Sequence, residues 1–330
     1  MNKKALIIGK FMPLHKGHLA LIHSTRALAQ KITVLLCVEH AEPINGDDRE
    51  RWLRNTFADD PQITIQRYDY SDADLPATSV SSRAVSELWT AILKTLIPDA
   101  DLIVGSEAYV RYVAELWGID YHIFDEQRIT VPISATEIRA NPYLHRKLLT
   151  PAARPDFVQK IVLHGTESTG KSTLTRHLAD HFNTTYVPET AREIVGHTDT
   201  VTFADLLTIA ERQAEAIQAA LPQADGVLFI DTDVWSTVAY ARYLFGRELP
   251  LQTNWLAAAK SALCLYCTAE APYVQDGTRL EVAERLELDG FHRAARLESG
   301  VRVVEVGGAD WVARTTRAIA AVRRQLGGRQ

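Results

Sequence analysis

The chain has 330 residues, of which 46% are hydrophobic and 23% are charged, and its formal net charge is −5 at pH 7. This composition excludes a disordered protein and is sufficient for two globular domains of ordinary size. There is no basic excess, and no Lys/Arg-rich arm or helix-turn-helix segment precedes the first predicted strand, so nucleic acid is not an expected partner.

The start of the chain and its cysteines indicate the compartment. The apolar run after Lys3 and Lys4 is far too short for the core of a signal peptide, and no run has transmembrane length, so we expect a cytoplasmic protein without a membrane partner. The three cysteines argue against a disulfide scaffold. Cys264 and Cys267 form a C-x-x-C on a predicted strand, where positions i and i+3 point to opposite faces. No second Cys or His pair lies nearby, so we expect inert core cysteines rather than a zinc or redox site.

The first predicted element is a strand that ends at Gly9, and a loop with the pattern G-x-F-x-P-x-H-x-G-H follows it. A helical run begins at Leu19. His15 and His18 flank a glycine at the predicted helix N-terminus, where the N–H groups of the first turn are free to face an anion. A histidine pair alone is also explained by a surface turn or a helix cap, but the complete string is specific and predicts a phosphate-binding loop.

This string resembles that of the nucleotidyltransferase superfamily of adenylyl- and cytidylyltransferases, and residues 133–139 are similar to its I-S-x-T-x-x-R signature. Between the two motifs, predicted strands at 31–38, 63–66, 101–104 and 121–124 alternate with helices, which favours a parallel sheet covered on both faces. Ligands bind such sheets at the carboxyl ends of the strands, where both motifs would lie. The resemblance implies an ATP site formed by Gly9, Phe11, His15, His18, Ser134, Thr136 and Arg139.

Adenylyl transfer explains these residue types. The acceptor phosphate is already anionic when it attacks the α-phosphorus of ATP, so the site needs positioning and positive charge rather than a strong base. The resemblance gives His15 and His18 contacts with the α- and β-phosphates, and Ser134, Thr136 and Arg139 contacts with the β- and γ-phosphates. Both histidines and Arg139 are the expected catalytic residues. Lys10 and Lys16 are either auxiliaries or solvated charges.

The acceptor site is less clearly marked. Residues 43–52 look similar to the stretch by which nicotinamide mononucleotide (NMN) adenylyltransferases approach their pyridine nucleotide, which implies that Arg49 binds the acceptor phosphate. Trp52 and Trp89 are candidates for stacking on the pyridinium ring, although a tryptophan on an amphipathic helix is usually a core residue. Residues 69–89 match no acceptor motif, so the identity of the acceptor is an analogy with the family.

A domain boundary is predicted near Thr150. Residues 149–156 contain two prolines and small residues and have no apolar period. We therefore divide the chain into an N-terminal domain of residues 1–150 and a C-terminal domain of residues 151–330.

The C-terminal half begins with a second phosphate-binding pattern. Residues 165–172 fit G-x-x-x-x-G-K-[ST] at every fixed position, between a predicted strand and a predicted helix. An ordinary glycine-rich turn is the alternative. In such a loop backbone N–H groups converge on phosphate oxygens, Lys171 adds a positive charge, and Ser172 offers a hydroxyl to Mg²⁺. The predicted ATP site of this half is Gly165, Thr166, Glu167, Ser168, Thr169, Gly170, Lys171, Ser172 and Thr173, together with Arg279.

The metal and the acceptor are expected at the ends of the next strands. Asp231 ends an apolar strand in the Walker B pattern, so Ser172 and Asp231 would hold Mg²⁺ directly or through water. Glu189 and Arg192 resemble the Glu…Arg pair that small-molecule nucleoside kinases place beside the acceptor hydroxyl. Glu189 would orient or deprotonate that hydroxyl and Arg192 would bind a phosphate or ribose oxygen, although a helix start with an i to i+3 ion pair explains them equally well. Asp233 is the other candidate for the acceptor's hydroxyls.

A lid is predicted at residues 270–279. Arg279 is the first candidate for a charge brought over the transferred γ-phosphate and Arg285 the second, whereas an exposed loop with ordinary charges is the alternative. Lys171, Glu189, Asp231, Asp233 and Arg279 are therefore the candidate catalytic residues of this half.

The order of the two halves resembles the NadR family, bifunctional NMN adenylyltransferases and ribosylnicotinamide kinases, over nearly the whole chain. The resemblance implies an α/β fold with two doubly wound parallel-sheet domains, an N-terminal Rossmann-like HxGH nucleotidyltransferase and a C-terminal P-loop kinase. It implies that nicotinamide riboside is phosphorylated to NMN with Mg²⁺ and ATP, and that NMN and a second ATP give NAD and pyrophosphate. The expected partners are these small molecules, and a homo-oligomer stays open.

Three other possibilities bear on this interpretation. Some family members have an N-terminal DNA-binding domain and act as repressors; the chain starts directly with the transferase strand, so a repressor role is not expected. Phosphopantetheine adenylyltransferase fused to dephospho-CoA kinase also pairs these domain types. A non-enzymatic NAD or ATP sensor is the third, against which the intact phosphate-binding residues of both halves count.

Overall fold

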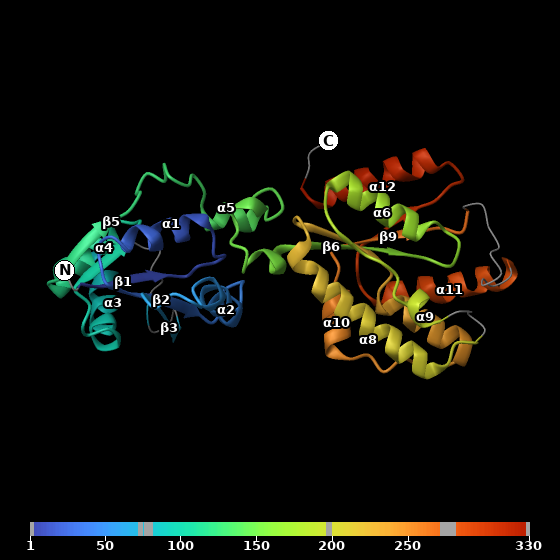
Figure 1. The fold of residues 1–330 in the computed structure, drawn as a ribbon, viewed down its shortest axis with the longest axis horizontal. Coiled ribbons are helices and arrows are strands. Elements are labelled where there is room, and N and C mark those ends of the chain that lie inside the picture. The colour runs from blue at the N-terminus through green and yellow to red at the C-terminus, as the bar shows by residue number, and fades with distance from the viewer. Residues whose placement is uncertain (1–2, 72–74, 76–81, 196–199, 271–281, 328–330) are drawn as a thin grey trace. The chain divides into compact units, whose positions relative to one another are not determined.

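The computed structural model describes residues 3–71, 75, 82–195, 200–270 and 282–327. The chain divides into two compact units, Met1–Arg154 and Pro155–Gln330, here called the N-terminal and C-terminal units (Figure 1). The boundary between the two units, between Arg154 and Pro155, lies within residues 149–156, the segment that was used to predict a boundary. No helix among the described residues is both long and apolar enough to cross a membrane.

The N-terminal unit is built on a five-stranded parallel sheet with the order β3-β2-β1-β4-β5. Its strands are β1 (Lys4–Gly9), β2 (Lys31–Glu39), β3 (Ile63–Tyr70), β4 (Leu102–Gly105) and β5 (Asp120–Ile123), and its helices are α1 (Lys16–Thr25), α2 (Gly46–Thr56), α3 (Arg83–Leu96), α4 (Tyr109–Trp117) and α5 (Ala135–Ala140). The order reverses at β1, so the switch point where ligands bind such sheets lies at its carboxyl end.

The C-terminal unit repeats this architecture with the order β10-β9-β6-β8-β7, again all parallel. Its strands are β6 (Gln159–His164), β7 (Tyr186–Val187), β8 (Val227–Asp231), β9 (Leu263–Cys267) and β10 (Val303–Val306). Its helices are α6 (Lys171–Phe182), α7 (Ala191–Ile194), α8 (Phe203–Ala220), α9 (Val234–Phe245), α10 (Thr253–Ala259), α11 (Val282–Glu298) and α12 (Trp311–Gln325). Short 3-10 helices cover Arg146–Leu148, Arg154–Phe157 and Leu221–Gln223.

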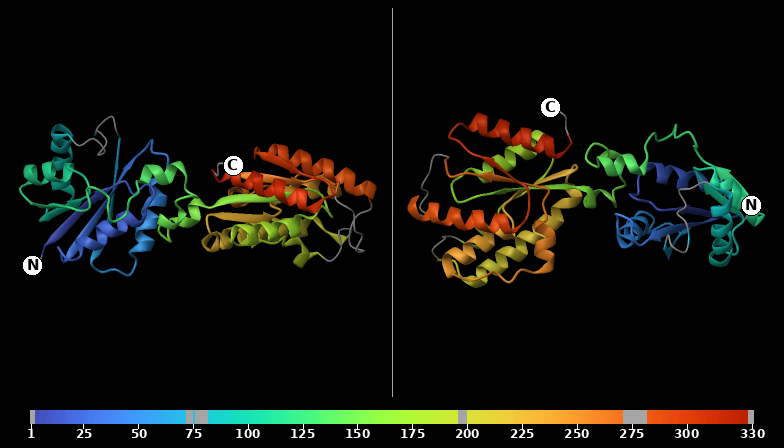
Figure 2. Two further views of the ribbon diagram at one scale, coloured as in Figure 1. Left: turned by 90° about the horizontal axis from the view of Figure 1, so that it is seen from above. Right: turned by 180° about the vertical axis from the view of Figure 1, so that it is seen from behind.

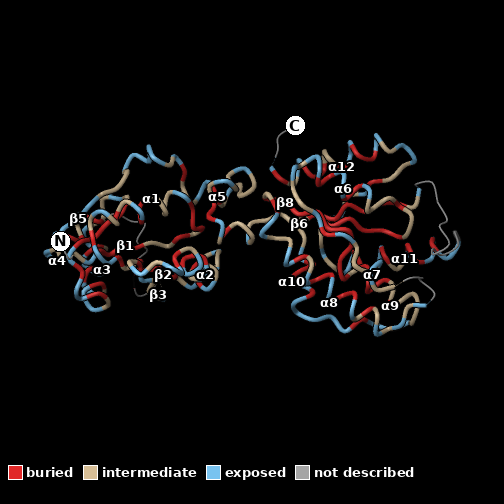
Figure 3. The backbone as a smooth tube through the Cα atoms, in the orientation of Figure 1, coloured by how far each residue is buried: buried red, intermediate tan, exposed pale blue. Residues whose placement is uncertain are grey.

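Apolar residues on the strands explain why helices cover both faces of each sheet. β8 and β9 are buried along their full length, as expected for strands shielded on both sides (Figure 3). In the C-terminal unit α6 and α12 lie on one side of the sheet and α8 and α10 on the other, as Figures 1 and 2 show. The predicted fold class is confirmed.

The core position predicted for Cys264 and Cys267 is confirmed. Cys264 and Cys267 are fully buried on β9. Burial raises the pKa of the Cys264 thiol to about 12 and that of Cys267 to about 11, so both stay protonated and unreactive at neutral pH.

Candidate active sites

The two histidines of the first motif are fixed by the start of α1. His15 is the N-cap of this helix, and its Nδ1 accepts a hydrogen bond from the Gly17 N–H (3.1 Å). His18 Nδ1 accepts in turn from the His15 N–H (3.3 Å), and the two ring centroids are 3.8 Å apart. Since both Nδ1 atoms accept, each neutral ring has its proton on Nε2 and can donate it to a ligand.

Both rings are neutral. Burial lowers the pKa of His15 to about 4, and burial together with the neighbouring His15 holds the pKa of His18 well below its usual range. The charge of Arg128, on the segment before α5, acts in the same direction on both rings. The histidines therefore offer hydrogen bonds rather than positive charge to a ligand.

Arg139 joins the second motif to the first. From α5, its Nη1 donates to the carbonyl oxygen of Met12 in the histidine loop, and its Nη2 donates to Thr136 Oγ1 (3.0 Å). Ser134 caps the same helix, because its Oγ accepts from the Glu137 N–H (3.1 Å) and donates to Glu137 Oε2 (2.6 Å). Thr136 and Arg139 thus lie beside the loop, whereas the Ser134 hydroxyl is engaged in positioning the helix.

Phe11 packs against His18, and Gly9 leaves room for the Phe11 ring. Phe11 is buried with a φ of 47°, and its ring packs edge-on against His18 at 5.0 Å between centroids. A Cβ on Gly9 would come within 3.0 Å of that ring. The structure therefore gives Phe11 a packing role under the loop, and Gly9 provides the space for it.

The predicted acceptor residue Arg49 is fully buried on α2. Its Nη1 lies 2.7 Å from Glu42 Oε2 and donates to the Lys10 carbonyl oxygen (3.1 Å), and Lys10 Nζ pairs with the other oxygen of Glu42 (2.7 Å). In this structure Arg49 braces the loop that leads to the histidines. To bind an acceptor phosphate it would have to give up its pairing with Glu42.

Both candidate stacking rings lie in the core. Trp52 is 1% exposed and Trp89 3% exposed. Trp89 packs edge-on against Tyr70 and Tyr68, with ring centroids at 5.2 and 6.3 Å. Neither indole ring, as placed here, is open to a pyridinium ring.

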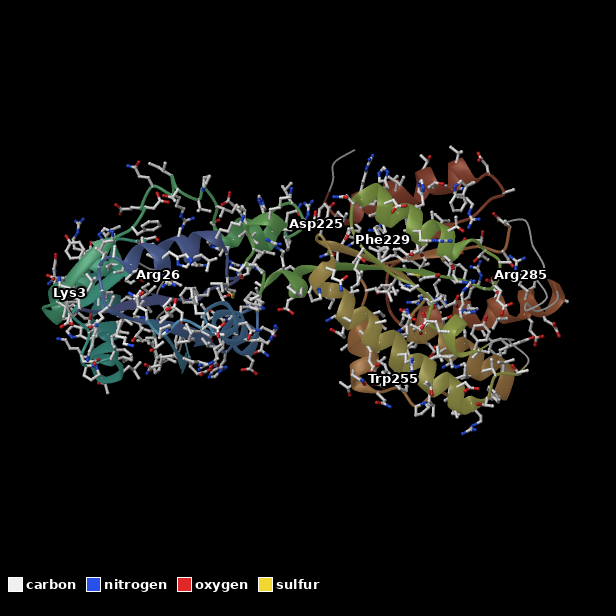
Figure 4. The ribbon with its side chains drawn as sticks, in the orientation of Figure 1. Lys3, Arg26, Asp225, Phe229, Trp255 and Arg285 are labelled. Carbon is white, nitrogen blue, oxygen red and sulfur yellow. The ribbon has the colours of Figure 1, made fainter. Side chains whose placement is uncertain are left out.

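A cavity of about 1090 Å³ in this unit does not belong to the motifs. Its lining includes Lys3, Lys31 and Asp120, which lie at or next to the amino ends of the strands, and Arg26 after α1 (Figure 4). The histidine loop follows the carboxyl end of β1, at the opposite edge of the sheet. Lys3 is paired with Asp120 and Arg26 with Asp60, so two of the cavity's cations are already neutralised.

The second phosphate loop connects β6 to α6 and has the backbone that its glycines predict. Gly165 has a φ of 132° and Gly170 a φ of 78°, a region that favours glycine. Lys171 Nζ lies across the loop and donates to the Thr166 carbonyl oxygen (2.9 Å), to which Thr169 Oγ1 also donates (2.9 Å). Arg314 of α12 donates to the Thr169 carbonyl oxygen (2.6 Å). Ser168 completes the turn, and Thr173 lies exposed in the first turn of α6.

Ser172 and Asp231 fit a magnesium ion. Asp231 is buried at the end of β8, where burial and the charge of Glu189 raise its pKa to about 6, while a hydrogen bond from Ser172 opposes that rise. Its Oδ1 atom is buried and has no hydrogen-bond partner among the described residues. A hydroxyl and an unpartnered carboxylate oxygen are ligands that Mg²⁺ accepts. No cluster of three or more His, Cys, Asp or Glu in the described segments could hold a metal by itself.

Glu189 and Arg192 lie beside that pair. Arg192 Nε donates to Glu189 Oε2 (3.1 Å), and its Nη2 reaches Ser172 Oγ (3.4 Å). The structure thus brings Lys171, Ser172, Glu189, Arg192 and Asp231 together at the carboxyl ends of β6, β7 and β8.

Asp233 and Arg285 are placed differently from the prediction. The Asp233 side chain has no exposed surface, caps α9 through the Trp235 N–H (3.1 Å), and accepts two hydrogen bonds from Arg296 (2.6 and 3.2 Å). It is therefore not available to an acceptor hydroxyl. Arg285 is buried and donates to the carbonyl oxygens of Glu167 (2.8 Å) and Ala269 (3.2 Å), so it braces the phosphate loop and does not extend from a lid. Arg279 lies outside the described residues.

Sequence reasoning missed several residues that contact these loops or act on them through their charge. Arg128 acts on both histidines, Arg314 holds the phosphate loop from α12, and Tyr240 donates to Glu167 Oε1 (2.8 Å). None belongs to a local motif. The one available signal was an arginine on an otherwise amphipathic helix, which is too common to select Arg314.

Three comparisons connect this geometry to known proteins. A family model described as an AAA domain matches residues 160–314. The chain is 28% identical over 343 residues to the trifunctional NAD biosynthesis/regulator protein NadR of Escherichia coli K12, covering 98% of this chain and 83% of that protein.

Two solved structures resemble the whole chain. A crystal structure of NadR in complex with NR has a TM-score of 0.78 at 25% identity, covering 99% of this chain and 97% of that one. A NadR structure in complex with NAD and AMP-PNP has a TM-score of 0.79 at 24% identity, covering 100% of this chain and 98% of that one. The likeness to NadR in sequence and in fold thus extends over nearly the entire chain.

Proposed function

We propose that the chain is a bifunctional enzyme of NAD biosynthesis. The C-terminal unit phosphorylates nicotinamide riboside to NMN, and the N-terminal unit transfers the adenylyl group of ATP to NMN, giving NAD and pyrophosphate. The observation that supports this most directly is the presence of two separate phosphate-binding loops, one in each unit, in a chain similar to NadR over 98% of its length.

The kinase reaction is assigned to the residues around the second loop. The 5′-hydroxyl of the riboside attacks the γ-phosphorus of ATP, the bond to the bridging oxygen breaks, and ADP leaves. Lys171 and the loop N–H groups hold the β- and γ-phosphates. Glu189 is the candidate acceptor for the hydroxyl proton, because it lies close enough to Asp231 to raise the pKa of that carboxyl and is not sequestered as Asp233 is.

Magnesium is proposed as the kinase cofactor. Ser172 and Asp231 would hold it, because they offer a hydroxyl and a buried carboxylate oxygen that has no partner among the described residues. When bound, the ion would neutralise charge on the phosphates of the nucleotide. Asp231 must lose its proton to serve as a ligand, and its raised pKa makes that loss pH-dependent near pH 6.

The adenylyl transfer is assigned to the first loop. A phosphate oxygen of NMN attacks the α-phosphorus of ATP and pyrophosphate leaves, so no side chain has to remove a proton. The Nε2–H groups of His15 and His18 would donate to the phosphates. Arg139, which donates to the Met12 carbonyl oxygen, and Thr136, whose hydroxyl accepts from Arg139, would bind the departing pyrophosphate. Both reactions consume ATP, so we expect the enzyme in the cytoplasm.

Two active-site variants test the assignment independently. Purified protein is incubated with Mg²⁺-ATP and nicotinamide riboside, and ADP, NMN, pyrophosphate and NAD are followed by chromatography. Lys171→Ala should stop NMN formation from the riboside but leave NAD formation from added NMN intact. His18→Ala should do the reverse, so that NMN accumulates. Each variant is thus the control for the other.

The outcomes separate the alternatives. Failure of the wild type to consume riboside would remove the kinase assignment and make coenzyme A precursors the next substrates to try. Binding of ATP without any turnover would indicate a sensor. Loss of both activities in either variant would contradict the division of labour between the two units.

A further inference from the structure

A chain of buried polar side chains runs beneath the kinase site. Arg296 of α11 donates two hydrogen bonds to Asp233, just after β8, and its Nη2 also donates to Nδ1 of His164 (2.7 Å), the last residue of β6. His164 Nε2 lies 3.1 Å from Nδ1 of His292, again on α11. Arg296 and His292 are each 1% exposed, and His164 and the Asp233 carboxylate have no exposed surface.

The proton positions in this chain follow from the donors. The guanidinium of Arg296 can only donate, so Nδ1 of His164 accepts, and a neutral His164 places its proton on Nε2 and donates to His292. Burial and the charge of Arg296 hold the pKa of His164 well below its usual range, and burial does the same for His292. The arrangement therefore persists throughout the neutral pH range.

Arg296 thereby ties together the two strand ends that form the site. Gly165, the first residue of the phosphate loop, directly follows His164, and Asp231 lies two residues before Asp233. Thr232, between the two acids, has a φ of 66°, so the backbone turns sharply there. A shift of Arg296 would change the distance between the phosphate loop and Asp231.

Helix α11 also contacts the phosphate loop directly, through Arg285 in its first turn. Arg285, labelled in Figure 4, donates to the Glu167 carbonyl oxygen (2.8 Å), and the Arg285 carbonyl oxygen accepts from Thr166 Oγ1 (3.2 Å). Tyr240 of α9 packs edge-on against His292 at 5.5 Å between centroids and donates to Glu167 Oε1 (2.8 Å). α11 therefore contacts the phosphate loop directly and through the buried chain.

We propose that Arg296 and His164 are positioning residues of the kinase reaction, which set the spacing between the phosphate loop and the metal-binding carboxylate Asp231. Neither touches a substrate in this proposal. The inference rests on the proposed kinase function. It predicts that loss of Arg296 weakens the kinase step and its use of Mg²⁺ even in protein that remains folded.

The variant Arg296→Gln tests this. Because displacing catalytic groups by about 1 Å can cost about 100-fold in rate, we expect kcat for riboside phosphorylation to fall at least about tenfold. The Mg²⁺ concentration for half-maximal activity should rise at least about threefold, since Ser172 and Asp231 no longer hold their spacing. Amide hydrogen exchange within residues 165–170 should become faster.

The helix supplies a matched control. Arg293 also lies on α11 and pairs with two carboxylates, Asp289 (2.9 Å) and Glu305 (2.6 Å). Its guanidinium lies over the Tyr266 ring of β9 (4.7 Å), and among the described residues it forms no ion pair with Asp233 or Asp231. Arg293→Gln should keep the wild-type kcat, Mg²⁺ dependence and loop exchange. Formation of NAD from added NMN, the reaction of the other unit, should be unchanged in every variant.

Two further variants separate positioning from folding. Arg296→Gln removes the cation that is hydrogen-bonded to the buried Asp233, so the double variant Asp233→Asn with Arg296→Gln removes both charges together. His164→Asn keeps an acceptor close to the position of Nδ1 and should retain much more kinase activity than His164→Leu.

Mere loss of folded protein lowers kcat but leaves the Mg²⁺ midpoint and the exchange of the remaining native protein unchanged. That result, or wild-type kinetics in the double variant, would overturn the proposal. Absence of riboside phosphorylation in the wild type would instead refute the kinase assignment.

Discussion

Replacement of Gly165 by alanine should disable one activity and leave the other intact. Gly165 begins the kinase phosphate loop with a φ of 132°, and a Cβ at this position would lie 2.3 Å from the backbone oxygen of Cys267 on β9. That oxygen belongs to a strand that pairs with β6, so it cannot rotate away as the end of a side chain could.

The size of the effect follows from this contact. Carbon and oxygen atoms in proteins need a separation of about 3.0 Å or more, so the loop has to move by roughly 0.7 Å. A displacement of about 1 Å in a catalytic site costs on the order of 100-fold in rate. We expect kcat/KM for riboside phosphorylation to fall 10- to 100-fold, roughly 1.4 to 2.7 kcal/mol in transition-state stabilisation.

Gly300 provides the control. It lies in the same unit with a φ of 66°, but a Cβ there would meet nothing within 4 Å. Gly300→Ala therefore introduces left-handed strain of roughly 1–2 kcal/mol without a clash and should preserve kinase kinetics. Both variants are assayed for ADP formed with riboside and for NAD formed from added NMN. Wild-type kinase kinetics in Gly165→Ala would refute the reasoning, and so would a loss of NAD formation.

Two predictions concern the stability of the N-terminal unit. The pKa of His15 is lowered from 6.5 to about 4 in the folded protein, so between these pH values the unfolded chain binds more protons than the folded protein. The contribution of His15 to the free energy of unfolding should therefore be complete above pH 6.5. It should be lost as the pH falls toward 4, by up to about 3 kcal/mol. Urea unfolding at several pH values should show this slope, His15→Gln should reduce it, and an unchanged slope would contradict the burial argument. Glu42→Ala should lower the free energy of unfolding by about 3–5 kcal/mol, because it leaves the buried Arg49 guanidinium without its carboxylate. The control Asp69→Ala, which removes an exposed partner of Arg67, should lower it by less than about 1 kcal/mol. Equal losses in the two alanine variants would mean that burial of the Arg49 pair has no energetic consequence.

The parts of the molecule that the sequence predicts are those defined by local rules. Alternating strands and helices, with both motifs after strand ends, were sufficient for two doubly wound sheets. The loops around His15 and Lys171 are likewise local, because glycines, a helix start and a few side chains at fixed spacing define them. The approach of Arg139 to the histidine loop could be expected as well, since both motifs follow parallel strands of one sheet.

Charged residues without a local motif were harder to interpret. Arg49, Asp233 and Arg285 were predicted to meet ligands, yet each is buried and paired with other protein groups: Arg49 with Glu42 and the Lys10 carbonyl oxygen, Asp233 with Arg296, and Arg285 with the carbonyl oxygens of Glu167 and Ala269. The sequence shows that a charged residue lies next to a motif. It does not show whether that side chain contacts the substrate or neutralises another charged side chain of the protein. Only the contacts in the folded structure distinguish these two possibilities, and a single sequence does not give them.

The two sites handle similar phosphates with different groups, and this difference should appear in their pH dependence. The histidines of the transferase site are held neutral, His15 with a pKa of about 4, so their state hardly changes between pH 7.5 and pH 5.5. Burial and the charge of Glu189 raise the pKa of Asp231 in the kinase site to about 6, so the ionised fraction of this carboxyl falls between pH 7.5 and pH 5.5. Because a metal-binding carboxylate must be ionised, we expect the kinase rate at limiting Mg²⁺ to fall severalfold relative to the transferase rate as the pH is lowered over this range. Both reactions use ATP, so titration of ATP itself largely cancels in the ratio of the two rates measured on one preparation. Saturating Mg²⁺ should return the ratio of kinase to transferase rate at pH 5.5 to its value at pH 7.5, since the ion competes with the proton for Asp231. If this ratio at limiting Mg²⁺ does not change with pH, Asp231 is not the group that limits metal binding.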